Sequence, residues 1–156
     1  MSKRTKARKI KTYKYIGKHG AYNIYFVNGK PVIGVDIGYG NVKTHNCIIK
    51  NGVESYDSKP PFAKNVVEYD NKYFVIGEGR KPYNMDRTVD EDSFILVLAA
   101  IAMELENIGI TTTEVILVSG LPLKWFARDK DKFKDYLSRA KHVTYKFNDK
   151  AYDITI

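Results

Sequence analysis

The sequence has a single cysteine, Cys47, among its 156 residues. One cysteine excludes an internal disulfide framework and favours a reducing compartment, so we expect a cytoplasmic protein. Cys47 lies in the apolar run 46–49 and is expected to be a small buried side chain. Histidine is also scarce: His19, His45 and His142 are scattered, and no Cys/His cluster has the spacing of a zinc site.

Long hydrophobic runs are missing as well. The longest, residues 94–103, is shorter than the ~18 residues that a membrane-spanning helix requires. The N-terminus is basic but lacks the apolar segment of a signal peptide. We therefore expect no membrane partner.

Acidic residues are absent from the first 35 positions, which contain nine Lys or Arg. The whole chain has 26 basic and 18 acidic residues, so residues 36–156 carry 17 and 18 and are nearly neutral. The basic character therefore belongs to the N-terminus. Residues 1–20 are predicted to form a flexible basic arm, which is either a solvated tail or a contact for nucleic acid or an acidic filament neighbour.

The remaining residues, 21–156, predict one α/β domain. Gly, Asn, Asp and Pro clusters separate short apolar runs, and the two-residue sequences Asn28-Gly29, Asp70-Asn71 and Asn148-Asp149 predict tight hairpins. Residues 80–90 read as a loop. The predicted helices are 90–107, with Gly109 as its C-cap, and 123–140. The predicted strands are 22–27, 32–37, 42–50, 54–56, 66–69, 73–77, 114–119, 143–147 and 152–156.

The strongest chemical motif follows the buried run 32–37 and reads Asp36-x-Gly38-x-Gly40-x-x-Lys43. Glycines are expected to permit positive φ and close approach of a ligand, so that successive amides can form a nest for phosphate oxygens. Lys43 is placed to neutralise phosphate, and Asp36 to hold Mg²⁺ through water. A strand follows the motif, so it is neither a P-loop nor a Rossmann fingerprint. The alternative reading is a Gly-rich hairpin with a surface lysine.

The segment 35–43, Val-Asp-Ile-Gly-Tyr-Gly-Asn-Val-Lys, resembles the first phosphate motif of the actin/sugar-kinase/heat-shock-chaperone superfamily. It is most similar to the ParM-like plasmid-segregation and archaeal actin-like proteins. Residues 73–79, Tyr-Phe-Val-Ile-Gly-Glu-Gly, resemble the hairpin that follows in this family. Residues 115–123, Val-Ile-Leu-Val-Ser-Gly-Leu-Pro-Leu, resemble its strand and Gly-Leu-Pro loop. The resemblance covers residues 32–156.

The resemblance implies a ribonuclease-H-like lobe, in which helices pack on a mixed sheet and ATP with Mg²⁺ lies between two such lobes. Gly38, Tyr39, Gly40 and Asn41 would supply phosphate-binding amides. Lys43 would contact the phosphates, and Asp36 would organise Mg²⁺ and water. Tyr39 stands where many relatives have Ser or Thr, so a hydroxyl contact to phosphate is not expected there.

The resemblance further implies that the water-positioning Gln or Glu would come just after Ile156, and that the adenosine site lies in the second lobe. We therefore expect this chain alone to bind ATP weakly and to hydrolyse it negligibly. A full-length form would assemble with itself into filaments, for plasmid or DNA segregation through a DNA-bound adaptor.

Two alternative functions remain at this stage: a small-molecule kinase of the same superfamily, and a nucleic-acid-binding module that uses the basic arm. Other clusters have structural readings: 90–92 as a helix start, Trp125 and Phe126 as core, and Ser119 as a serine without a matching histidine. The tyrosines among the N-terminal lysines would be a base-stacking surface or, preferably, strand packing. One conflict stands out, because the hairpin at Asn28-Gly29 places 22–27 beside a strand that the family flanks on both sides.

Overall fold

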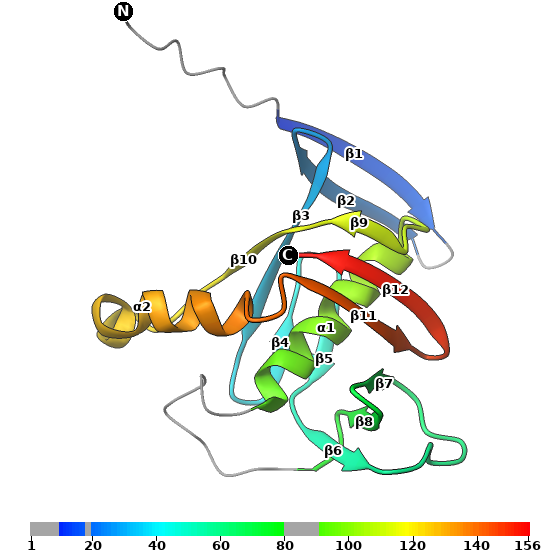
Figure 1. The fold of residues 1–156 in the computed structure, drawn as a ribbon. Helices are drawn as coiled ribbons and strands as arrows, with labels where there is room; N and C mark the ends of the chain where they lie inside the picture. Colours follow the sequence, from blue (N-terminus) through cyan, green and yellow to red (C-terminus); the bar gives the residue numbers. More distant parts are fainter. Residues whose placement is uncertain (1–9, 18–19, 80–90) are drawn as a thin grey trace, which may run out of the picture.

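The computed structural model describes residues 10–17, 20–79 and 91–156. Within these residues the chain forms two six-stranded sheets and two helices (Figure 1). The first sheet has the order β1-β2-β3-β4-β5, with β10 also paired to β3. Its strands are β1 (Ile10–Gly17), β2 (Gly20–Val27), β3 (Lys30–Ile37), β4 (Asn41–Lys43), β5 (Ile48–Lys50) and β10 (Ile116–Ser119).

The second sheet has the order β6-β8-β7-β11-β12-β9. Val115, between β9 and β10, is buried and donates its N–H to the Thr155 carbonyl at 2.8 Å, so a single segment joins both sheets. The predicted α/β class with helices on mixed sheets is confirmed. The strands are β6 (Val53–Tyr56), β7 (Val66–Tyr69), β8 (Lys72–Ile76), β9 (Thr112–Glu114), β11 (His142–Phe147) and β12 (Lys150–Thr155).

Turn chemistry sets three hairpins as the sequence predicts. Both residues of each two-residue turn adopt positive φ: 52° and 80° at Asn28-Gly29, 49° and 58° at Asp70-Asn71, and 48° and 67° at Asn148-Asp149. Asn, Asp and Gly tolerate this left-handed backbone, whose twist matches that of the flanking strands. The turns therefore fix the registers of β2–β3, β7–β8 and β11–β12.

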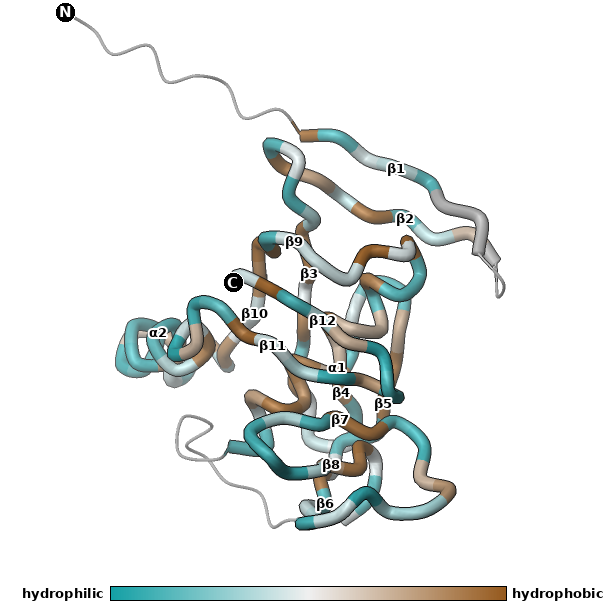
Figure 2. The backbone as a smooth tube through the Cα atoms, turned by 45° about the vertical axis from the view of Figure 1, so that its right-hand side comes forward, coloured by the Kyte–Doolittle hydropathy of each residue, from teal (hydrophilic) through white to brown (hydrophobic). Residues whose placement is uncertain are grey.

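Helix α1 (Glu91–Glu106) is the centre of the core. It contacts β3 and β4 of the first sheet and β6, β7 and β8 of the second, so apolar residues surround it and most of its side chains are buried. Gly109, at φ 68°, ends it as predicted, and the N–H groups of residues 108–110 bond to carbonyls of the last turn. Figure 2 shows the hydrophobic run of α1 inside the molecule.

Helix α2 (Leu123–Leu137) is shorter than the predicted 123–140. The Ser138 hydroxyl donates to the Lys134 carbonyl at 2.8 Å, and the Ser138 N–H bonds to the same carbonyl. This local side-chain bond competes with continued helix. Only Phe133, Tyr136 and Leu137 of α2 are buried, so its first turns project from the side of the molecule (Figure 1).

The predicted strand 42–50 is wrong, because it is two short strands, β4 and β5, around a turn. The turn is held by Glu104 of α1, which is 3% exposed. Its carboxylate accepts bonds from the Thr44 hydroxyl at 2.5 Å, the Asn46 N–H at 2.8 Å and the Asn46 side-chain amide at 2.7 Å. A buried carboxylate needs such donors, and they are available only if the chain turns here.

The predicted arm 1–20 is wrong from Ile10 onward, since Ile10–Gly17 forms β1 in full register with β2. Residues 1–9 and 18–19 lie outside the described residues.

The hairpin at Asn28-Gly29 places β2 beside β3, a strand that the family flanks on both sides. β3 is long enough for these neighbours to pair with different parts of it. β2 pairs with residues 30–32 of β3, and β4 pairs with residues 36–37. Val32 pairs with both Tyr25 and Ile116, so β2 and β10 lie on opposite sides of β3.

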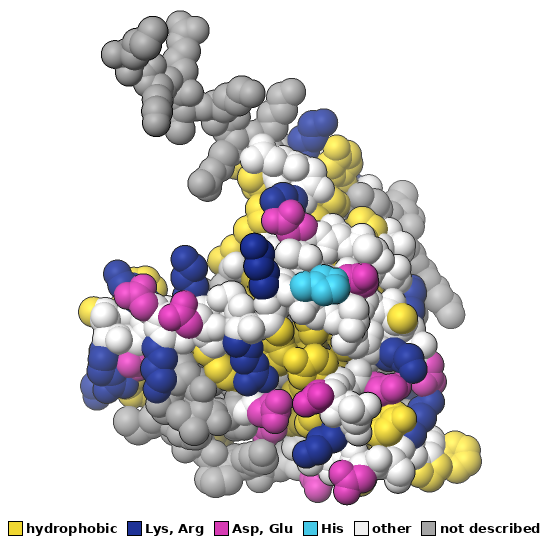
Figure 3. All heavy atoms as spheres, in the orientation of Figure 1, with side chains coloured by type: hydrophobic (Ala, Val, Ile, Leu, Met, Phe, Trp, Pro, Cys, Tyr) yellow, Lys and Arg dark blue, Asp and Glu magenta, His cyan; other side chains and the backbone are white. Residues whose placement is uncertain are grey.

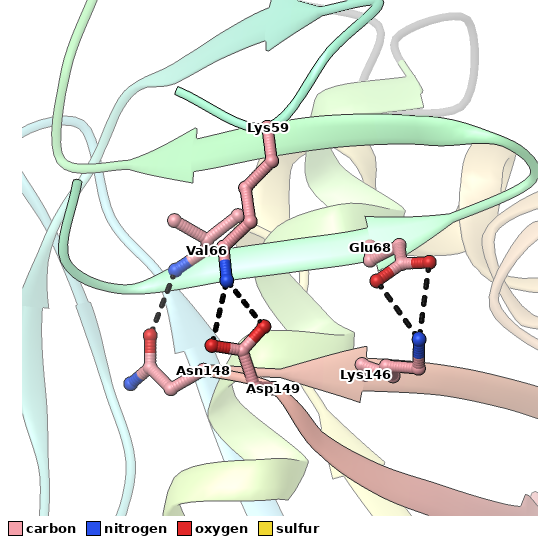
Figure 4. A network of polar contacts seen from close by, with 6 residues as sticks. All are labelled: Lys59, Val66, Glu68, Lys146, Asn148 and Asp149. Atoms are coloured by element: carbon pink, nitrogen blue, oxygen red, sulfur yellow. Dashed lines mark hydrogen bonds and ion pairs between the residues drawn. The ribbon is translucent and has the colours of Figure 1, made fainter. Parts of the chain in front are cut away.

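The loop between β6 and β7 is tied to the β11–β12 turn (Figure 4). Lys59 binds the Asp149 carboxylate at 2.5 and 2.7 Å, and Asn148 accepts the Val66 N–H at 3.0 Å. Lys146 binds Glu68 between β11 and β7. The contacts hold this loop and β7 against the β11–β12 hairpin. No helix in the described part of the chain is long and apolar enough to cross a membrane.

Two tyrosines that face each other across β11–β12 lie against α1. Tyr145 and Tyr152 stack with their ring centroids 5.5 Å apart. The Tyr145 hydroxyl donates to the Leu98 carbonyl at 2.8 Å, whereas the buried Tyr152 hydroxyl has no hydrogen-bond partner among the described residues. The two rings are thus alike in packing but differ in hydrogen bonding.

We expect Tyr145→Phe to lower the free energy of unfolding by about 0.5–1.5 kcal/mol, because a made hydrogen bond is lost. Tyr152→Phe keeps the stack and removes an unbonded hydroxyl, so its unfolding free energy should be unchanged or higher. Urea denaturation followed by circular dichroism measures both. Equal destabilisation by the two substitutions would contradict the assignment of hydrogen bonds.

The same pair predicts a pH dependence of stability. Burial raises the pKa of Tyr152 to about 12 and the pKa of Tyr145 well above its usual range. The unfolded chain therefore ionises these tyrosines first, near their ordinary pKa of about 10. The stabilisation is complete below about pH 10 and is lost as pH rises toward 12. Urea titrations between these values should show a shallower decline for Tyr152→Phe than for the unsubstituted protein.

Candidate functional site

The carboxyl ends of β3 and β10 lie at the same edge of the first sheet, because these strands are parallel and in register. The predicted phosphate loop, residues 38–40, follows β3. The Gly-Leu-Pro loop, residues 120–122, follows β10 and leads into α2. Two of the three segments that carry the sequence resemblance are therefore neighbours at this edge.

Gly38 is required for close approach and not for left-handed backbone. The expectation of positive φ at Gly38 and Gly40 is wrong, because neither has it. The Gly38 N–H donates to the Asn41 carbonyl at 2.9 Å, and a Cβ at Gly38 would lie 2.7 Å from that oxygen. A Cβ at Gly40 would meet nothing within 4 Å. The turn therefore has no room for a side chain at Gly38 but is open at Gly40.

Asn51, at the end of β5, braces this loop. Its side-chain amide donates to the Gly38 carbonyl at 2.7 Å, and its N–H donates to the Gly40 carbonyl at 3.0 Å. Sequence reasoning missed this role, since Asn51-Gly52 reads as an ordinary turn. An asparagine after a strand that pairs with the motif hairpin is the signal that was available.

Gly52 joins the same region to the segment 77–79, the third part of the resemblance. Gly52 has φ 142°, and a Cβ there would lie 2.3 Å from the Gly79 carbonyl oxygen. The Gly77 N–H donates to the Gly52 carbonyl at 2.9 Å. Gly77 and Gly79 are themselves left-handed, at φ 88° and 71°. Asn51-Gly52 thus connects the phosphate loop to the glycines after β8.

Ser119 joins β10 to β3 by donating its hydroxyl to the Val35 carbonyl at 2.8 Å. This bond explains the serine structurally and leaves no reason to treat it as a nucleophile. It ties the start of the Gly-Leu-Pro loop to the strand that carries Asp36.

The charged residues of the motif face each other across the hairpin. Asp36 of β3 is in register with Lys43 of β4, so both side chains lie on the same face of the sheet, where both are exposed. Among the described residues, neither side chain has a hydrogen-bond or ion-pair partner within the protein. A carboxylate and an ammonium are therefore available side by side at the edge of the sheet.

The backbone amides of the loop are only partly available. The Gly38 N–H is used within the turn, whereas the Gly40 N–H makes no backbone hydrogen bond to any described residue. The Tyr39 side chain, at the tip, is 75% exposed. The loop can offer the Gly40 amide, the opening beside it and the Lys43 ammonium to an anion.

The motif offers one carboxylate, which fits a magnesium ion whose other ligands are waters and phosphates. No group of three or more His, Cys, Asp or Glu that could hold a metal occurs in the part of the chain that is described. Mg²⁺ is commonly bound through one or two carboxylates, several waters and substrate phosphates, and the single exposed carboxylate of Asp36 suits that mode.

The two motif glycines make a matched test of this geometry. We expect Gly38→Ala to lower the free energy of unfolding by about 1–3 kcal/mol, because the new methyl would meet the Asn41 carbonyl oxygen. Gly40→Ala should change it by less than about 0.5 kcal/mol. Urea denaturation provides both values. The description of the turn would be wrong if both variants had the same stability.

Residues 34–156 match the family model for the N-terminal domain of actin-like proteins. Apo pSK41 ParM is similar in structure, with a TM-score of 0.64 and 17% identity, over 80% of this chain and 46% of that one. A structure of the Alp12 filament gives a TM-score of 0.52 and 20% identity, over 80% and 44% of the two chains.

The chain thus spans less than half the length of either solved structure. No curated protein matches it significantly. The family match includes the three segments that meet around the end of β3, namely the phosphate loop, the glycines after β8 and the Gly-Leu-Pro loop. The chain belongs to the family of actin-like protein N-terminal domains.

Proposed function

We propose that this chain is one wall of a nucleotide cleft, which binds the phosphates of ATP with Mg²⁺ and is completed by a second lobe. The observation that carries the proposal is the unpartnered Asp36–Lys43 pair beside a braced glycine loop. Family membership and the likeness to ParM in fold support it.

Each residue has a distinct part in this proposal. Lys43 would neutralise phosphate charge. Asp36 would hold Mg²⁺ through water, and the ion would supply further charge neutralisation. Gly40 lets phosphate approach the backbone, since no side chain covers it. Asn51 holds the loop carbonyls away from the anion by donating hydrogen bonds to them. Gly38, Tyr39 and Asn41 shape the turn.

One wall alone binds weakly in this proposal, because the resemblance places the contacts to base and ribose in the second lobe. Completed by a second lobe, the protein is an ATPase that polymerises with itself. The Alp12 neighbour was solved as a filament. The resemblance to ParM-like proteins supports a plasmid-segregation role and a cytoplasmic location. A DNA-bound adaptor is the further partner in that role.

The chain itself permits a direct test. Titrating Mg-ATP into the isotopically labelled protein should shift the amide resonances of residues 36–43 first, with a dissociation constant in the millimolar range. Lys43→Ala should remove these shifts, while Lys72→Ala, an exposed lysine at the start of β8, should retain them. Shifts confined to another surface, or a micromolar constant for the unsubstituted chain, would contradict the half-cleft proposal.

A longer form of the protein that carries the second lobe tests the proposed tight ATP binding and filament formation. It should bind Mg-ATP much more tightly, and Lys43→Ala should weaken that binding by about tenfold or more, since a charge-assisted hydrogen bond is lost. Addition of ATP should increase light scattering as filaments form. Tight binding without scattering would favour a superfamily kinase over a filament protein.

A further inference from the structure

The β1–β2 ribbon, residues 10–27, has no part in the proposed function. The family match begins at residue 34, so the ribbon lies outside it. The ribbon extends from the start of β3, away from the loop edge that carries Asp36 and Lys43 (Figure 1). Its fold therefore needs a separate explanation.

The ribbon carries charge of one sign only. The sequence contains no acidic residue before Asp36. Lys11 and Lys14 of β1 are exposed, and within the described residues neither side chain has a hydrogen-bond or ion-pair partner. Lys30, at the base of the ribbon, is by contrast neutralised by Glu114 at 2.5 Å. Two unpaired ammonium groups on an acid-free ribbon make a surface complementary to a polyanion.

The outer edge of β1 is open, since among the described residues β1 pairs only with β2. Lys11 and Lys14 are three residues apart and so lie on opposite faces of the strand. Eight residues of strand span about 27 Å, and a two-stranded ribbon fits the major groove of DNA. The edge amides and the lysines on both faces could thus reach phosphates of both groove walls.

Two aromatic rings of the ribbon are already in contact with neighbouring rings. Tyr13 packs edge-to-face on Phe26 with ring centroids 5.2 Å apart, and Tyr25 packs on His45 at 5.8 Å. These contacts engage each ring, although Tyr13 and Tyr25 keep 42% and 45% exposure. The ribbon's unpaired groups are its lysines, and their charges favour the dense phosphates of a duplex.

We propose that the β1–β2 ribbon binds double-stranded DNA through phosphate contacts, independently of the nucleotide site. The five basic residues that precede β1 in the sequence, Lys3, Arg4, Lys6, Arg8 and Lys9, add to the attraction for DNA. Binding of this kind has little sequence preference and weakens steeply with salt.

The test measures fluorescence anisotropy of a labelled duplex of mixed sequence, with the full chain, over a series of salt concentrations. The double variant Lys11→Gln/Lys14→Gln should bind at least about tenfold more weakly at low salt, and its salt slope should fall by about two. The control, Lys124→Gln/Lys130→Gln, removes the same charge from α2, where basic and acidic side chains are mixed (Figure 3). Its binding should stay close to that of the unsubstituted chain.

Circular dichroism and urea denaturation should show that both double variants remain folded. The same pair of variants in a chain lacking residues 1–9 separates the ribbon from the preceding segment, and the ribbon variant should again be the weaker binder. Equal binding by the two double variants would overturn the proposal and leave the lysines as a guard against edge pairing. Stronger binding to a single strand of the same length would also overturn it, in favour of base stacking.

Discussion

The pairing of β3 with three other strands is the constraint on which the rest of the structure depends. Its first residues bind β2, its middle binds β10, and its last two bind β4. Its alternate residues Ile33, Val35 and Ile37 are buried in the core that also contains α1. Because one strand meets all of these elements, its register decides which side chains reach the loop edge. A shift of one residue would bury Asp36.

Local chemistry was enough to predict much of this arrangement. Asn-Gly, Asp-Asn and Asn-Asp each form the expected left-handed turn, because the preference belongs to the two residues themselves. The apolar run of α1 and the Gly109 cap are similarly local. The motif 36–43 could be located for the same reason, although its use in binding ATP remains a proposal.

What could not be predicted depends on partners distant in the sequence. The break between β4 and β5 is set by Glu104, about sixty residues away, and a carboxylate within an apolar helix gives no sign of its target. β1 was missed because its lysines and tyrosines become a strand only beside β2. The brace from Asn51 to the Gly38 carbonyl also required the folded hairpin. The end of α2 at Ser138, by contrast, was a local signal left unread.

The change of sheets at Val115 has a mechanical consequence. β10 is held by β3 and β9 by β12, and the Val115–Thr155 bond extends the pairing with β12 to the residue that precedes β10. A load applied at the loop after β10 would be shared by two ladders on two different sheets. The lobe should therefore respond to such a load as a single rigid lever, with little internal shear.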